Sequence, residues 1–409
     1  MFLVLSIFLA SAQGAIPQEL RRYYELAQKQ SETLEMAKSR QKQAEERKDQ
    51  ALGTLFPNIN ARYNYTEIDP PPAPRSAFTR INQYSGLINV NQPIFRGSAI
   101  AAYGYTKDDI RLQQRLAEQT GLGLWQEVAL AYYTAWMARN DLANISKLRD
   151  YSDERVRDLK ERVRVGRSRR GELNQAEAQL MSVDAEVARA TQVKAEAEER
   201  LAFLTGVPQS PGFETMPEPL LTTPPVQTYL EQAKNRPDLA AKRYEIEMSD
   251  ELISGAKAGH MPSVDFNGNY YVERTGVLQD SNWDIGVAVN IPIFQGGTVQ
   301  GLVRERVEKK RETILAYDRL KREIDRDIRI LWHNSTALDK VVNDLRGSLD
   351  KAKATYEANK RDYNYGLVTN LDVLLTMNQY IETKRSFERA LMEKELTGLQ
   401  ITVATGVTP

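Results

Sequence analysis

The residues that most often carry enzyme chemistry are scarce in this chain. Its 409 residues include no cysteine and only two histidines, His260 and His333, which show no metal-ligand spacing. Without thiols, disulfide bonds, thiolate metal sites and thiol catalysis are excluded. The sequence also lacks the GxxxxGK[ST] phosphate-binding loop and the GxSxG nucleophile elbow. We therefore predict that the protein is not an enzyme and uses no cofactor or metal.

The polar residues that could act together lie in two short segments 200 residues apart. Residues 165–173 read VGRSRRGEL, and residues 365–373 read YGLVTNLDV. A glycine followed by a hydroxyl residue and then an acid is typical of a turn between two helices. Glu172 and Asp372 hold equivalent positions in these segments, where a carboxylate stabilises the dipole of the next helix. Each segment is thus predicted to be the tip of a helical hairpin.

The two tips belong to a duplication that covers most of the chain. The segment NQPIFRG at 91–97 returns as NIPIFQG at 290–296, and LTGV at 204–207 returns as ATGV at 404–407. This period is far above the 20 to 50 residues of solenoid repeats. The sequence therefore predicts two copies of one supersecondary unit.

Each copy contains two segments in which apolar and polar residues alternate. They lie near 58–68 and 81–95 in the first copy, and near 263–275 and 282–294 in the second. Segments of about nine to eleven residues suit tilted strands of a membrane barrel, although a soluble half-buried sheet also shows this alternation. In the last strand we predict that Trp283, Ile285, Val287 and Val289 face lipid, whereas Asp284 and Asn290 face the lumen or partner loops.

Composition points to the cell envelope. The 55 basic residues balance the 55 acidic ones, so no nucleic-acid partner is implied. The apolar residues 2–10, followed by small residues, predict a signal peptide over 1–14. No later segment reaches 18 consecutive apolar residues, as a transmembrane helix requires. A secreted chain with bilayer-length strands is therefore expected in an outer membrane.

Long helices are predicted between the strand pairs. After Gly171 the apolar positions recur every three or four residues, the heptad pattern of helices that pack side by side. A helix over 97–165 would be roughly 100 Å long. A soluble coiled-coil spacer would share this pattern.

The whole arrangement resembles the outer membrane factor family, the TolC-like efflux and type I secretion channels. The resemblance covers nearly the whole mature chain and rests on several motifs in order. These are Pro57 and Pro262 before the strands, QPIF at 92–95, RPDL at 236–239, IPIFQGG at 291–297 and YGLVTNLDVL at 365–374.

The resemblance implies a mainly α fold with a small transmembrane β part. Three chains would form a homotrimer, each giving four strands to a 12-stranded barrel in outer membrane lipid and long helical hairpins to a periplasmic α-barrel. It further implies a passive export duct for efflux or type I secretion, working with a periplasmic adaptor protein and an inner-membrane transporter. A periplasmic adaptor or a structural coiled-coil protein of the envelope is the alternative.

Relatives of this kind close their periplasmic entrance at the hairpin tips. By motif match, Asp372 would form a ring of carboxylates around the pore, and Glu172 would accept a hydrogen bond from Tyr363. Two positions depart from the family pattern: Val368 stands where a gating arginine is expected, and Leu375 where a second aspartate is expected. The exposed tips would contact the adaptor through Gly166, Arg167, Arg169, Arg170, Gly366, Leu367 and Thr369. The three arginines among them could instead replace the missing cation.

The predicted domain organisation has four parts. The signal peptide spans 1–14, the first repeat 15–207, a proline-rich equatorial linker 208–236 and the second repeat 237–409. The hairpin tips lie near 165–172 and 365–372. Segments 69–80 and 275–282 are expected to be extracellular loops between paired strands.

Overall fold

The computed structural model describes residues 17–67, 69, 82–207, 223–275, 278 and 280–408. The predicted signal peptide, most of the predicted loop at 69–80 and the first fifteen residues of the linker, 208–222, lie outside the described residues.

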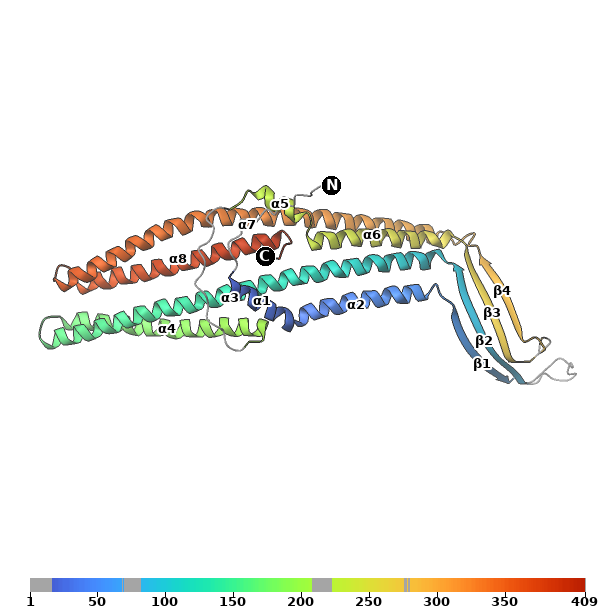
Figure 1. Ribbon diagram of the computed structural model, residues 1–409, viewed down its shortest axis with the longest axis horizontal. Coiled ribbons are helices and arrows are strands. Elements are labelled where there is room, and N and C mark those ends of the chain that lie inside the picture. The colour runs from blue at the N-terminus through green and yellow to red at the C-terminus, as the bar shows by residue number, and fades with distance from the viewer. Residues whose placement is uncertain are drawn as a thin grey trace, which may run out of the picture. The chain divides into compact units, whose positions relative to one another are not determined.

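Long helices dominate the described chain, and four strands form one small sheet (Figure 1). The predicted fold class, mainly α with a small β part, is thus confirmed. No described helix is both long and apolar enough to cross a membrane. The elements in chain order are α1 (Gln18–Gln30), α2 (Glu32–Gly53), β1 (Asn58–Glu67), β2 (Asn82–Phe95), α3 (Gly97–Arg164), α4 (Arg170–Thr205), α5 (Val226–Ala233), α6 (Pro237–Lys257), β3 (Ser263–Arg274), β4 (Trp283–Asn290), α7 (Thr298–Asn364) and α8 (Asn370–Ala404).

The chain divides into two compact units that do not coincide with the two sequence repeats. The strand unit comprises Met36–Ala117 and Pro237–Lys321, and the tip unit comprises Met1–Glu35, Glu118–Arg236 and Arg322–Pro409. Each repeat contributes to both units, because α3 and α7 each continue from one unit into the other.

The strand unit contains an antiparallel sheet with the order β1-β2-β3-β4. Its register joins the apolar positions into a row across all four strands, with Ile59 opposite Val90, Val90 opposite Gly268, and Gly268 opposite Ile285. The next row is polar. Its side chains form a chain of hydrogen bonds from Asn89 to Asn269 at 2.8 Å and from Asn269 to Asp284 at 2.8 Å. Alternation along each strand therefore separates an apolar face from a polar face.

Among the described residues, β1 pairs only with β2, and β4 only with β3. Each outer strand therefore has one edge without a partner strand in this part of the chain. All residues of both outer strands are exposed in the single chain, including Trp283, Ile285 and Val287.

The helices of the strand unit are joined by a small apolar cluster and by ion pairs. Leu112 of α3 packs with Ala241 and Met248 of α6. Asp109 of α3 is buried and pairs with Arg47 of α2 at 2.6 Å. These contacts hold α2, α3 and α6 side by side within the unit.

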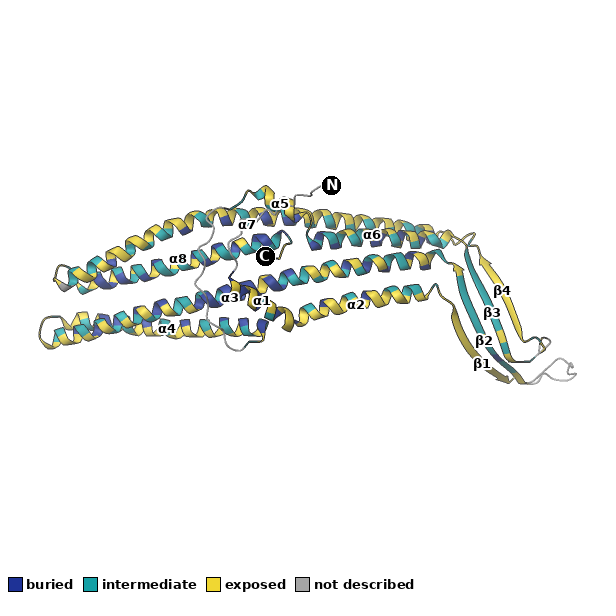
Figure 2. Cartoon of the chain, viewed as in Figure 1, coloured by how far each residue is buried: buried dark blue, intermediate teal, exposed yellow. Residues whose placement is uncertain are grey.

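The tip unit has two apolar cores. In the first, α1 packs on α3 through residues such as Leu20, Tyr23 and Tyr132, around the buried Trp125. In the second, Ile145 of α3, Val183 of α4 and Ile381 of α8 meet. Figure 2 shows buried positions recurring among exposed ones along these helices.

The predicted heptad seam of α4 is confirmed. The buried residues Ala176, Val183, Ala190 and Ala197 follow one another at intervals of seven positions. Three of these four are alanines, which allow neighbouring helices to approach closely. α4 therefore presents one narrow stripe to its neighbours along most of its length.

Candidate gate at the hairpin tips

The two hairpin tips have the same backbone geometry, as the repeat predicts. Gly166 ends α3 with φ of 75°, and Gly366 follows α7 with φ of 74°. In each tip the amide of the residue after the glycine caps the C-terminus of the helix. The Arg167 N–H donates to the Arg162 carbonyl at 2.7 Å, and the Leu367 N–H donates to the Asp362 carbonyl at 3.0 Å. Glycine is needed at both positions because a side chain would strain a left-handed backbone.

Asp372 caps the N-terminus of α8. Its Oδ2 accepts hydrogen bonds from the Thr369 amide at 2.8 Å and the Thr369 hydroxyl at 2.6 Å. The Thr369 hydroxyl in turn accepts from the Asp372 amide, which completes a capping box. These bonds hold the pKa of the Asp372 carboxyl below its usual range, so that the group is charged at neutral pH.

Glu172 lies at the equivalent position of the first tip but makes a different contact. It is exposed, and its carboxylate accepts a hydrogen bond from the Ser168 hydroxyl. The predicted bond between Glu172 and Tyr363 stays a prediction.

Tyr363 lies against two arginines of α3. The guanidinium carbon of Arg155 is 3.7 Å from the centroid of the Tyr363 ring, and that of Arg162 is 4.8 Å away. Both distances are within the range of a cation–π contact. This contact joins the first hairpin to the second, because Tyr363 belongs to the last turn of α7.

Four residues at this contact were not among the predicted site residues. They are Arg155, Asp158, Arg162 and Asn370. Asp158 lies between the two arginines, with contacts of 3.4 Å to Arg155 and 3.1 Å to Arg162. Arg155 Nε also donates to the side-chain oxygen of Asn370, the first residue of α8. The spacing of residues 155, 158 and 162 by three and four places them on one helix face, which was the available signal.

Stacked aromatic rings extend the contact between the hairpins. Tyr356 of α7 lies parallel to Tyr380 of α8 with ring centroids 5.9 Å apart, and Tyr151 of α3 lies 6.1 Å from Tyr356. Burial raises the pKa of Tyr356 to about 12. Tyr151 and Tyr356, with Arg155 and Tyr363, line a cavity of about 250 Å³.

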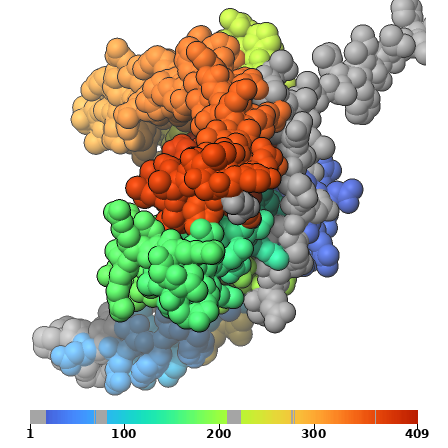
Figure 3. Space-filling model, turned by 90° about the vertical axis from the view of Figure 1, so that its left-hand side faces the viewer, coloured from blue at the N-terminus to red at the C-terminus, as the bar shows by residue number. Residues whose placement is uncertain are grey.

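The residues predicted to contact an adaptor are exposed. Figure 3 views this end of the tip unit, with the end of the first hairpin in green against the second hairpin in orange and red. The exposed residues are Gly166, Arg167, Arg169 and Arg170 of the first tip and Gly366, Leu367 and Thr369 of the second. Val368, by contrast, packs against the apolar cluster that also receives Tyr363.

A second polar cluster, around Lys394, is buried in the tip unit. Lys394 Nζ lies 2.5 Å from Asp339 Oδ1, 2.8 Å from the Ser335 hydroxyl and 3.0 Å from the Thr223 hydroxyl. The Trp332 indole donates to the Pro224 carbonyl at 2.8 Å. This cluster joins residues 223 and 224 to α7 and α8.

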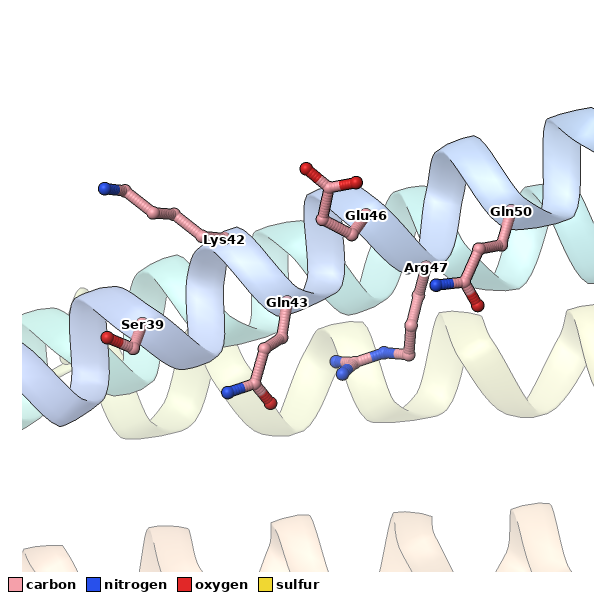
Figure 4. A pocket seen from close by; sticks show the side chains of 6 residues that line it. All are labelled: Ser39, Lys42, Gln43, Glu46, Arg47 and Gln50. Atoms are coloured by element: carbon pink, nitrogen blue, oxygen red, sulfur yellow. The ribbon is translucent and has the colours of Figure 1, made fainter.

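Other features of the described chain do not form a ligand site. The side chains of a shallow depression on α2 spread along the helix without converging (Figure 4). One of them, Arg47, is already paired with Asp109. No group of three or more His, Asp or Glu side chains that could hold a metal is found within the described residues.

Several known proteins share this architecture. The protein of Vibrio cholerae called outer membrane protein TolC is 23% identical over 98% of this chain and 95% of its own length. The outer membrane efflux protein BepC of Brucella suis is 23% identical over 87% of this chain and 78% of its own. Among solved structures, the outer membrane protein VceC of Vibrio cholerae has a TM-score of 0.80 at 22% identity, covering 95% of this chain and 96% of that one. A membrane protein of Pseudomonas aeruginosa has a TM-score of 0.84 at 19% identity, covering 96% and 91%.

The family model of the outer membrane efflux proteins matches residues 23–207 and 229–406, which include both tips and nearly all of both predicted repeats. This match covers far more than half of the chain. The chain therefore belongs to the outer membrane efflux protein family and is an export channel of the outer membrane.

Proposed function

We propose that three copies of this chain form a passive duct, which receives cargo from an inner-membrane pump through a periplasmic adaptor. The observation that carries the proposal is the four-stranded sheet with a free edge on both β1 and β4. Hydrocarbon cannot hydrogen-bond to unpaired backbone groups, so a sheet in a bilayer must close into a barrel. Four strands per chain close as 12 strands in the trimer that the family resemblance implies.

The two faces of the sheet support this placement. One face carries exposed apolar side chains such as Ile59, Ile285 and Val287, and the other carries the hydrogen-bonded row of Asn89, Asn269 and Asp284. An apolar exterior and a polar interior are the two surfaces of a membrane barrel.

The proposed duct has no energy source of its own. The sequence lacks a nucleotide-binding motif, and the family is named for efflux rather than for an enzyme activity. Transport work therefore comes from the pump. The exposed arginines Arg167, Arg169 and Arg170 of the first tip, with Leu367 of the second, form the surface proposed to meet the adaptor.

The entrance of the duct is proposed to carry a ring of three Asp372 carboxylates. Both hydrogen bonds from Thr369 go to the Oδ2 atom, so capping of α8 is compatible with a charged group facing the axis. Three carboxylates around a narrow opening attract cations and give the closed entrance cation selectivity.

Disulfide cross-linking tests barrel closure directly, because the chain contains no native cysteine. Ala61→Cys on β1 is combined in turn with Trp283→Cys, Ile285→Cys or Val287→Cys on β4. We expect at least one pair to give a ladder of cross-linked species that ends at three chains. Ala61→Cys alone is the control and should stop at two chains or fewer. A monomeric mass in detergent, with no ladder from any pair, would contradict the proposal.

A further inference from the structure

We infer that a cation–π contact holds the two hairpins of each chain together at their tips. In this contact, here called the clasp, the guanidinium groups of Arg155 and Arg162 on α3 lie against the ring of Tyr363. The inference rests on the proposed function, because it concerns the entrance of the same channel. It differs from the hydroxyl lock between Tyr363 and Glu172 that the resemblance implies. In the clasp the aromatic ring makes the contact, so the tyrosine hydroxyl is dispensable.

The geometry favours the ring over the hydroxyl. The guanidinium carbon of Arg155 is 3.7 Å from the ring centroid and that of Arg162 is 4.8 Å from it. Glu172, the acceptor of the alternative lock, is exposed and bonded to Ser168 within its own tip. The chain thus already uses both partners of the alternative lock in other contacts.

Arg155 is held in place on three sides. Its side chain is only 16% exposed, and its Nη1 donates to Asp158 at 3.4 Å. Its Nε donates to Asn370 at the start of α8, so one guanidinium contacts both helices of the second hairpin. Its Nη2 atom is buried without a hydrogen-bond partner among the described residues, and this is the arrangement expected when a guanidinium is committed to an aromatic face.

Asp158 positions Arg162, the second arginine of the clasp. It contacts Arg155 and Arg162 from the same helix face, at 3.4 Å and 3.1 Å. One carboxylate between two guanidinium groups reduces their mutual repulsion, so both can approach the same ring. Val368, which stands where an arginine was expected, packs against the same apolar cluster as Tyr363. The cations of the clasp therefore come from α3 of the first hairpin.

The family resemblance implies that the entrance opens when the second hairpin moves away from α3, and this movement would separate Tyr363 and Asn370 from Arg155. A cation–π contact that is partly shielded from water shifts such an equilibrium by roughly tenfold. We therefore expect Tyr363→Leu and Arg155→Ala each to raise the ratio of open to closed entrances roughly tenfold per chain.

Single-channel recording in a planar bilayer tests the clasp with matched variants. Tyr363→Phe keeps the ring and removes the hydroxyl, so its resting conductance should equal that of the native protein. Tyr363→Leu and Arg155→Ala should raise resting conductance, and Glu172→Ala should not. An increase in Tyr363→Phe and Glu172→Ala equal to that in Tyr363→Leu would overturn the clasp in favour of the hydroxyl lock.

A distance measurement keeps the test independent of conductance. Nitroxide labels at Lys160 on α3 and Glu357 on α7, both exposed, report the separation of the hairpins in the otherwise cysteine-free chain. The distribution should be narrow for the native protein and Tyr363→Phe, and broader for Arg155→Ala and Tyr363→Leu. Native-like distributions in all four proteins would refute the clasp.

The two proposals fail in different ways. If the native protein forms no conducting pore in the bilayer, the proposed function is wrong, whatever the label distances. If it conducts but Arg155→Ala and Tyr363→Leu change neither conductance nor distances, only the clasp is wrong. The unboiled oligomer on a gel serves as the folding control for each variant, and Arg155→Lys, which keeps the charge but cannot lie flat on the ring, should have an intermediate effect.

Discussion

Replacing Val287 by arginine tests which face of β4 meets lipid. Val287 lies inside the strand, opposite Phe266, and 62% of its surface is exposed in the single chain. Arginine on the lipid face of a barrel near the bilayer midplane costs about 2 to 4 kcal/mol. Three copies would therefore destabilise a trimer by roughly 6 to 12 kcal/mol, comparable to the whole stability of a typical domain.

The neighbouring residue provides the matched control. Ala288 points to the opposite face, where its register partner is Asp265. Asp265 already pairs with Arg96 at 2.8 Å, so an arginine at position 288 would meet a carboxylate in a polar setting. We expect Ala288→Arg to change the stability of the assembly by no more than about 1 kcal/mol.

The assay is the yield of oligomer in outer membrane fractions, measured on unboiled gels and compared with boiled samples. Val287→Arg should lose most of the oligomer, whereas Ala288→Arg should retain it. Equal yields from the two variants would show that the faces of β4 have been assigned wrongly. Loss confined to Ala288→Arg would place residue 288, rather than 287, against lipid.

Three further predictions concern the tip unit. Asp372→Asn keeps an acceptor for Thr369 but removes the charge, so cation selectivity and block by divalent cations should fall in bilayer recordings; unchanged selectivity would leave Asp372 as a helix cap only. Lys394→Met removes the cation from the partly buried Asp339, which keeps its hydrogen bond from the Thr223 hydroxyl. This should cost about 1 to 3 kcal/mol in denaturant titrations, and adding Asp339→Leu should recover much of the loss. Burial raises the pKa of Glu395 to about 7. The folded state then binds the extra proton, so stability should fall as pH rises from about 4.5 to 7, by up to about 3 kcal/mol. Glu395→Gln should flatten this profile of melting temperature against pH.

Much of the architecture could be read from local patterns. Alternation with period two places the strands within a residue or so at most of their ends, and β4 ends earlier than predicted, at Asn290 rather than near 294. Asn290 pairs with Ser263, the first residue of β3, so β3 offers no partner to the residues that follow, and Gly296 and Gly297 then turn the chain with positive φ. The matched glycines at 166 and 366 likewise predicted both tips, since each ends its helix with a left-handed backbone.

The contacts between hairpins could not be read in this way. Arg155 and Tyr363 are 208 positions apart, and the local sequence around either residue does not identify the other as its contact partner. The same holds for Lys394 and Thr223, which meet at 3.0 Å across 171 positions. Both contacts depend on how the helices pack, so neither could be predicted from the sequence.

Local patterns are enough to define the elements of this protein, their order and their duplication, because helix and strand periods and glycine turns are local properties of the chain. The side chains that meet at the tips, in contrast, depend on how the helices pack. A cation–π contact or a buried ion pair depends on the rotation and axial shift of one long helix against another. A change of one residue in register rotates a helix by about 100°, which would turn Arg155 away from Tyr363 without changing any local pattern.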